Sequence, residues 1–289
     1  MSSQPFILAK PLECGLSLSL ALAPGANAGK ALKRVAAGYD LQWGTLGIGE
    51  PLVRALGKKV PGLSTFPAMS APGAGVPSTQ QAAWMMLAGL TQGDIFANLQ
   101  RIKALLGGDI VIADSMPTFA NASHDLSGYE DGTENPKGNK AVKAAILPSG
   151  DLAESGFVAV QRWVHDLDYF NSLSQSRRDN SIGRRLSDNE ELEDAPRSAH
   201  VKRTAQEQFE PNGFMLRRSM SFATDQIKGL EFISYVAHLD TFERQMRHMA
   251  GLDDGIADAL FTFSRPITGG YYWCPPARGN RPDLRILGL

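Results

Sequence analysis

The alternation of hydrophobic and polar positions predicts a similar series of strands and helices in each half of the chain. In the first half, residues 16–22 alternate apolar and small polar side chains, which is typical of a strand with one buried face. Two segments carry apolar residues at helical spacing, 26–37 and 91–106, and Gly107-Gly108 ends the second helix. Further extended segments are predicted at 41–48, 63–69, 82–90 and 109–113. This order of elements matches the split pattern of a ferredoxin-like domain.

The second half repeats the alternation. Strands are predicted at 157–164, 213–222, 231–238 and 271–274, and helices at 168–175 and 240–249. His165 is predicted to end the first of these strands, just before a helix cap. The sequence therefore predicts an α+β fold of two ferredoxin-like domains packed together, of the dimeric α+β barrel type. We expect the boundary near residue 150, with domains at 1–150 and 151–289.

Two long polar segments, 116–156 and 175–211, interrupt this pattern, and connections of such length are usually functional or linkers. The first contains Gly128–Pro136, which reads Gly-Tyr-Glu-Asp-Gly-Thr-Glu-Asn-Pro. Its glycines, Asn and Pro predict a loop that brings main chain close to a ligand, and a surface turn rich in acids is the plainer alternative. The second contains His200, and its alternative is a solvated surface excursion.

Composition narrows the class of protein. The chain has 289 residues, with 29 basic and 30 acidic side chains, so no global charge attracts it to nucleic acid or to a membrane surface. The two cysteines, Cys14 and Cys274, are far apart in sequence, which argues against a disulfide framework or a zinc knuckle and fits a reducing compartment. The N-terminus lacks the basic start and apolar run of a secretory signal, and no apolar run is long enough to span a bilayer. We therefore expect a cytoplasmic protein.

Several common kinds of site are excluded by their missing motifs. The sequence has no dinucleotide loop, phosphate-binding loop, His-Glu-x-x-His zinc helix or Gly-x-Ser-x-Gly elbow. No two of its five histidines have the spacing of a metal-binding pair, so a site with several histidine ligands is not expected. A single histidine can still hold the iron of haem, because the porphyrin supplies four nitrogens.

The Gly128–Pro136 segment resembles the Gly-x-x-Asp-Gly signature of the dye-decolourising peroxidases, in its long Asp-Gly-Thr-Glu-Asn-Pro form. Ser181–Arg184, Ser198–Arg203 and Met215–Ser219 resemble, in order, successive landmarks of the bacterial, type B-like branch of that family. The similarity covers the chain from about residue 120 to the Thr268–Pro276 end, whereas the N-terminal third agrees in layout more than in motif.

The resemblance implies a haem b cofactor and assigns roles to single residues. His200 matches the proximal iron ligand, Asp131 the distal acid and Arg217 the distal arginine. Ser219 occupies a position where other members carry asparagine, which puts the efficiency of peroxide cleavage in doubt. The neighbouring motif residues are implied contacts of the cofactor: Gly132, Thr133 and Glu134.

The chemistry explains why these residue types are wanted. Cleavage of hydrogen peroxide needs a proton moved from one oxygen to the other, and a positive charge near the oxygen that leaves. Asp131 could relay the proton and Arg217 could supply the charge. Asp258 is the candidate partner for the second N–H of His200, and capping of a helix is its alternative role.

Two further arginines are candidate partners of the haem propionates, because guanidinium groups match carboxylates. They are Arg184 and Arg203, and ordinary salt bridges are their alternative. His200 and Arg217 likewise have the alternative of solvated surface residues.

The resemblance implies a haem b peroxidase that reduces hydrogen peroxide through a ferryl intermediate and oxidises organic donors, including bulky dyes. The alternative is a haem-binding, storage or transfer protein with incidental peroxidase turnover. A barrel without a cofactor is disfavoured, because it leaves both long polar segments without a purpose. We expect self-association, and the tail, Arg281–Leu289, either docks into an encapsulating protein shell or frays.

Overall fold

The N-terminal half of the protein is an antiparallel sheet covered by two helices. The computed structural model describes residues 2–289. Four strands lie in the order β2-β5-β1-β6, which is the order of a ferredoxin-like domain. The strands are β1 (Cys14–Leu22), β2 (Gly44–Gly49), β5 (Ala83–Gly89) and β6 (Ile110–Phe119), and the helices are α2 (Ala28–Gly38) and α4 (Gln92–Leu106).

Local sequence explains these elements. Alternate residues of β1, namely Leu16, Leu18 and Leu20, belong to the main hydrophobic core together with apolar residues of α2 and α4. Helix α4 begins at a capping box in which Thr91 and Asp94 bond each other's backbone amides. It ends at Gly107, whose φ of 58° is left-handed and suits glycine.

The C-terminal half repeats this topology. Its strands lie in the order β12-β7-β10-β9, and α9 packs against β7 and β10. Two short strands, β8 and β11, extend the sheet beside β10 and β7. The elements are β7 (Gly156–His165), β8 (Leu216–Arg217), β9 (Met220–Ala223), β10 (Lys228–Val236), α9 (Leu239–Met249), β11 (Ser264–Pro266) and β12 (Gly270–Cys274).

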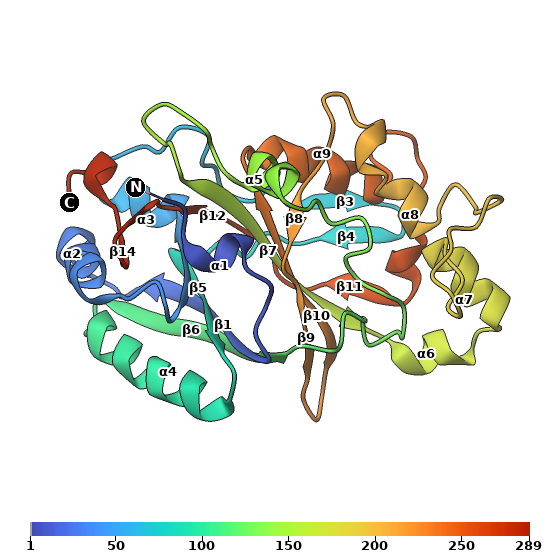
Figure 1. Ribbon diagram of the computed structural model, residues 1–289, viewed down its shortest axis with the longest axis horizontal. Helices are drawn as coiled ribbons and strands as arrows, with labels where there is room; N and C mark the ends of the chain where they lie inside the picture. Colours follow the sequence, from blue (N-terminus) through green and yellow to red (C-terminus); the bar gives the residue numbers. More distant parts are fainter. Residues whose placement is uncertain (1) are drawn as a thin grey trace.

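The two sheets join at both edges. Strand β12 pairs with β2, and β6 pairs with β9, so the strands close into a ring (Figure 1). Buried polar groups connect the halves inside it: Glu231 of β10 accepts hydrogen bonds from Ser17 of β1 and from Arg162 of β7. The prediction of two ferredoxin-like domains in an α+β barrel is therefore confirmed.

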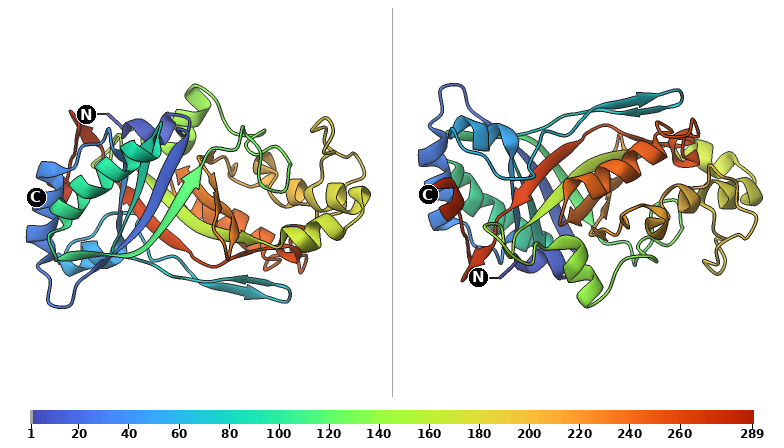
Figure 2. Two further views of the ribbon diagram at one scale, coloured as in Figure 1. Left: turned by 90° about the horizontal axis from the view of Figure 1, so that it is seen from below. Right: turned by 90° about the horizontal axis from the view of Figure 1, so that it is seen from above.

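The connecting segments add smaller elements. The hairpin formed by β3 (Met69–Ala71) and β4 (Ala74–Val76) belongs to the first half but reaches along β11 of the second, as Figure 2 shows. The other helices and strands are α1 (Pro5–Leu8), α3 (Glu50–Ala55), α5 (Asn139–Ala145), α6 (Leu167–Ser172), α7 (Gln175–Ile182), α8 (His200–Arg203), η1 (Gln206–Gln208), η2 (Ala259–Thr262), β13 (Ala277–Arg278), β14 (Arg281–Pro282) and η3 (Arg285–Leu287).

Some predicted elements differ from the structure. The strand predicted at 63–69 is wrong except for its last residue, because Pro61 and Pro67 cannot donate to a ladder and Phe66 N–H bonds the Gln80 side chain instead. The strand predicted at 213–222 is split into β8 and β9. The long polar segment 116–156 is not loop throughout, since β6 runs to Phe119 and α5 lies within it. The proposed boundary near residue 150 falls between α5 and β7.

The chain end is also ordered, so the expectation of a frayed tail is wrong. Leu284 and Leu287 are each 2% exposed and belong to the main core, and β14 pairs with β13. Among residues 2–289, no helix is long and apolar enough to cross a membrane.

Candidate active site

A largely apolar cavity of about 120 Å³ lies in the C-terminal half. One wall is the face of β7 and β10, where Trp163 and Phe232 point inward, and another is α9 with Phe242 and Met246. The long polar segments complete it and contribute Asp131 and His200. The fold therefore provides an apolar chamber with a few polar side chains at its edge.

His200 opens the short helix α8 and lines this cavity. Its Nδ1 lies 2.8 Å from Oδ2 of Asp258, whose side chain is fully buried. With the carboxylate ionised, Nδ1 donates the hydrogen bond and Nε2 keeps its lone pair. Nε2 makes no hydrogen bond with another residue in 2–289, which leaves it free to bind a metal.

Asp258 has both roles that the sequence left open. Its Oδ1 accepts a hydrogen bond from Leu260 N–H and caps η2, while its Oδ2 accepts from His200. Ala259 N–H donates to Ser198 O, which ties η2 to the segment just before His200. The carboxylate is thus held at both oxygens, and it orients the imidazole.

Arg203, at the other end of α8, holds the helix in place. Both of its terminal nitrogens donate to Asp254, each at 2.8 Å, and these hydrogen bonds hold the pKa of Asp254 well below its usual range. The Arg203 side chain is 3% exposed and does not line the cavity. The expectation that Arg203 binds a cofactor carboxylate is therefore not supported, because its guanidinium is already paired.

Arg217 and Asp131 reach the cavity from different elements. Arg217 is the last residue of β8, and Asp131 lies in the Gly128–Pro136 loop. Asn135 joins the two, because its side chain accepts a hydrogen bond from Arg217 N–H and donates one to Arg217 O, each at 2.8 Å. The sequence did not predict this pair of hydrogen bonds, although Asn135 belongs to the Gly128–Pro136 motif.

Neither functional group of this pair has a protein partner. The Arg217 guanidinium makes no ion pair or hydrogen bond within residues 2–289, and its Nε is buried. The Asp131 carboxylate is likewise unpaired there. A buried donor without a partner is costly, so the Arg217 Nε indicates a polar ligand in the cavity.

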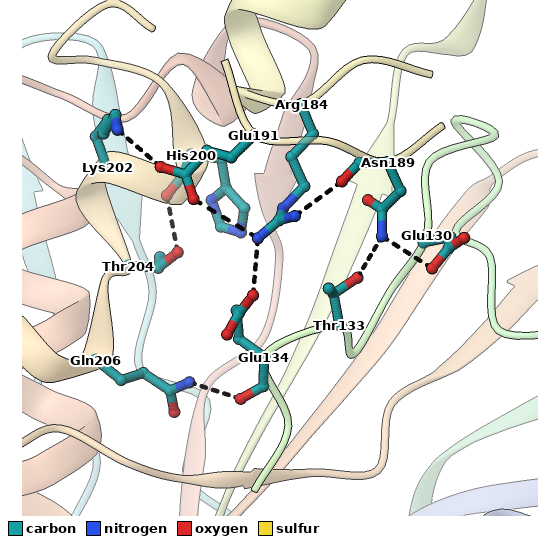
Figure 3. Close-up of polar contacts among 10 residues, drawn as sticks. All are labelled: Glu130, Thr133, Glu134, Arg184, Asn189, Glu191, His200, Lys202, Thr204 and Gln206. Carbon is teal, nitrogen blue, oxygen red and sulfur yellow. Dashed lines mark hydrogen bonds and ion pairs between the residues drawn. The ribbon is translucent and has the colours of Figure 1, made fainter. Parts of the chain in front are cut away.

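A polar network connects the two long loops beside His200 (Figure 3). Arg184 donates to Glu134 at 2.8 Å and lies 3.7 Å from Glu191. Asn189 donates to both Thr133 and Glu130. Arg184, Thr133 and Glu134 therefore hold the loops to each other.

The predicted residues separate into two groups. The structure brings His200, Asp131 and Arg217 to the cavity, with Asp258 directly behind His200. Ser219 does not line the cavity, and its hydroxyl accepts a hydrogen bond from Ile233 N–H. The other predicted residues that do not line it are Gly132, Thr133, Glu134, Arg184 and Arg203.

Several lining residues escaped sequence analysis. Gln161 and Gln245 are buried, and each has one amide atom without a partner. His165, at the end of β7, lies 3.0 Å from Asp125. Side chains alternate between the two faces of a strand, so Gln161 and His165 lie on the same face of β7 as Trp163. This alternation in the sequence could have identified them as lining residues.

A metal held by protein ligands alone is not indicated, because residues 2–289 contain no group of three or more metal-binding side chains. A single histidine ligand such as His200 needs a cofactor that supplies the rest.

Comparison with known proteins identifies the family of the chain. Residues 122–279 match the family model described as Dyp-type peroxidase, C-terminal. The chain is 31% identical over 189 residues to the dye-decolorizing peroxidase of Mycolicibacterium paratuberculosis and 32% identical over 184 residues to that of Mycobacterium tuberculosis. These alignments cover 62% and 61% of this chain, and 53% and 55% of the relatives, so the chain spans about half the length of the curated relatives it matches.

Solved structures extend the similarity to nearly the whole chain. A dye-decolorizing protein from V. cholerae superposes with a TM-score of 0.85 at 27% identity, covering 97% of each chain. A variant of DypB from Rhodococcus jostii RHA1 in complex with heme superposes with a TM-score of 0.86 at 25% identity, covering 93% of this chain and 95% of that one. Because the family model matches more than half of its residues, the chain belongs to the Dyp-type peroxidase family.

Proposed function

We propose that this protein is a haem b peroxidase that reduces hydrogen peroxide and oxidises organic donors, including dyes. One observation carries the proposal: a single cavity is lined by a histidine backed by a buried carboxylate, an unpaired arginine and an unpaired carboxylate. Membership of the Dyp-type peroxidase family supports it, as does the heme named with the Rhodococcus DypB variant.

The residues present fit a haem group. The apolar walls, among them Trp163, Phe232 and Met249, suit the faces and edges of a porphyrin. His200 would hold the iron, because its Nε2 is unpaired and its tautomer is set by Asp258. When bound, haem would supply the iron that takes the peroxide and the electrons that cleave its O–O bond.

Arg217 would stabilise negative charge and Asp131 would transfer a proton. Arginine is protonated at any working pH, and the Arg217 guanidinium has no carboxylate partner within residues 2–289, so its charge is available to the oxygen that leaves. Asp131 can take a proton from one peroxide oxygen and return it to the other, because no protein group competes for its carboxylate.

His200 and Asp258 would together hold the iron. A carboxylate that accepts the Nδ1–H makes the imidazole a stronger donor at Nε2. The burial of Asp258 excludes water from this hydrogen bond and keeps the ring orientation constant.

The organic donor is proposed as a class. The relatives are named for dyes, and bulky donors of this kind would react at the protein surface. The cytoplasmic location and self-association remain predictions.

The absorption spectrum of the haem-loaded protein tests the proposal. We expect one haem per chain, with a Soret band that is lost or strongly weakened in His200→Ala and retained in His238→Ala, an exposed histidine outside the cavity. Stopped-flow mixing with hydrogen peroxide should then show a fast spectral change that requires Arg217 and Asp131. A normal Soret band in His200→Ala would exclude His200 as the ligand. A slow change that is insensitive to Arg217 and Asp131 would instead indicate a haem-binding or transfer protein.

A further inference from the structure

His165 is a buried ionisable residue of the cavity wall to which the proposed reaction assigns no role. It ends β7, and its side chain is 4% exposed. Both ring nitrogens are engaged: Nε2 lies 3.0 Å from Oδ1 of Asp125, and Nδ1 lies 2.6 Å from Oγ of Ser264 on β11. Ser264 is directly opposite His165 in the sheet, so the ring is held by the rigid part of the fold.

Asp125 begins the turn that leads to Asp131. Its Oδ2 accepts a hydrogen bond from Ser127 N–H, and its backbone N–H donates to Tyr129 O. Gly128 N–H donates back to Asp125 O, which closes the turn. The Asp125 carboxylate thus connects this turn to β7 through His165.

Burial alone would raise the pKa of Asp125, but the hydrogen bond and charge of His165, together with the hydrogen bonds at Ser127, lower that pKa to about 2. Asp125 is therefore ionised at working pH, and Nε2 of His165 must carry the hydrogen that it donates. At Nδ1 either protonation state is satisfied, because the Ser264 hydroxyl can accept or donate.

Asp131 itself is held directly only through its backbone. Its backbone N–H donates to Ser123 O, and its carboxylate contacts no partner within residues 2–289. The Asp125 side chain holds the 123–131 turn on one side of that carboxylate, and the hydrogen bonds from Asn189 to Glu130 and Thr133 hold its neighbours on the other. An error of about 1 Å in such a group can reduce a rate by as much as a hundredfold.

We propose that His165 is a positioning residue, which holds the proton-transferring Asp131 in the cavity through the buried hydrogen bond to Asp125. The proposal rests on the proposed function in so far as Asp131 moves the proton. Its structural part, that His165 fixes the 123–131 turn, stands independently.

The kinetic test is a double-mutant cycle in the haem-loaded protein. We expect His165→Phe, which fills the space but cannot bond Asp125, to slow the reaction with peroxide about tenfold at acidic pH. Added to Asp131→Asn, the same change should cost less than about twofold, because the residue through which it acts is already disabled. Equal losses in both backgrounds would overturn the proposal.

A conservative variant of His165 and a control variant at another histidine complete the kinetic test. His165→Gln should recover most of the rate, because its amide can donate to Asp125 and accept from Ser264. His238→Phe, the same substitution at an exposed histidine, should leave the rate unchanged. If His165→Phe does not fold, Ser264→Ala takes its place with an expected loss of about threefold, again absent in the Asp131→Asn background.

Hydrogen exchange separates failure of this inference from failure of the proposed function. Amide exchange of residues 121–131 should be faster in His165→Phe than in the parent and in His165→Gln, while α9 exchanges at the parent rate. If Asp131→Asn alone reacts with peroxide at the parent rate, the proposed role of Asp131 fails. Faster exchange of the turn in His165→Phe would still support the inference that His165 fixes the turn. Unchanged exchange of the turn in His165→Phe would overturn that inference.

Discussion

The two halves share one topology, but the cavity that receives His200, Asp131 and Arg217 lies in the second. In the first half, Leu18 and Leu20 of β1 and Ile102 of α4 lie in one continuous core. In the second half, β7, β10 and α9 pack against one another and together line the cavity. The strand order therefore does not create the site.

The connections explain the difference. Between β1 and β2 the first half has the single helix α2, which packs on the core. Between β7 and β8 the second half has a long polar segment with α6, α7 and α8, and α8 brings His200 to the cavity. Loops that extend beyond a rigid scaffold often carry the function, and here they contribute His200 and Asp131 to the cavity.

The largest expected effect is on the stability of the cofactor-free protein, and it contrasts the core of the first half with the cavity wall of the second. Leu18→Ala should lower the free energy of unfolding of the cofactor-free protein by about 3 kcal/mol, because Leu18 is fully buried among apolar neighbours. Met246→Ala should cost only about 1 kcal/mol, since Met246 already borders open space. Urea unfolding measures both, and equal losses would mean that the cavity wall is packed as tightly as the closed core.

The next effect concerns Arg217. Arg217→Leu should slow the reaction with peroxide about a hundredfold at every pH, because arginine stays protonated throughout and the variant loses a preorganised charge. The neighbouring Arg218 is the matched control: it donates to Leu8 O and does not line the cavity, so Arg218→Leu should change the rate little. Stopped-flow absorbance measures both, and a nearly silent Arg217→Leu would remove Arg217 from the reaction.

The third contrast is between two carboxylates, Asp125 and Asp109, in their effect on the stability of the protein at low pH. The folded-state pKa of Asp125, about 2, lies below its value in an unfolded chain, so its stabilising contribution is present above about pH 4 and is lost as the pH falls towards 2. Asp125→Asn should remove a contribution on the order of 2 kcal/mol at neutral pH and flatten the acid limb of the stability curve.

A first-half carboxylate serves as the control for this effect. Asp109 pairs with Arg34 at the surface, and Asp109→Asn should change acid stability less, because solvent and salt screen that pair. Urea unfolding between pH 2 and pH 7 measures both variants. Identical pH profiles for the parent and Asp125→Asn would show that His165 does not stabilise the ionised carboxylate.

The smallest effect concerns Asp131. Asp131→Asn should slow the reaction with peroxide about tenfold at acidic pH and less at alkaline pH, because the hydroperoxide anion no longer needs the proton relay. The ratio of parent to variant rate across pH is the measurement. A variant that is more damaging than Arg217→Leu at every pH would reverse the roles assigned to the two residues.

The sequence by itself determined the repeated ferredoxin-like pattern, because a period of two or of 3.6 follows from which faces are buried, as the leucines of β1 show. It also singled out Asp131, His200 and Arg217, because their motifs are contiguous. The position of His165 at the end of its strand could be predicted as well.

Only the tertiary structure decided which charges meet. Arg203 and Arg184 were plausible cofactor ligands by type, but Asp254 and Glu134, 50 or more positions away in the chain, already occupy their guanidinium groups. His165 and Asp125 are separated by 40 positions and form a pair only because β7 ends beside the turn that carries Asp131. Periodicity is a local property of the chain, whereas the partner of a buried charge depends on which distant segments the closed barrel brings together.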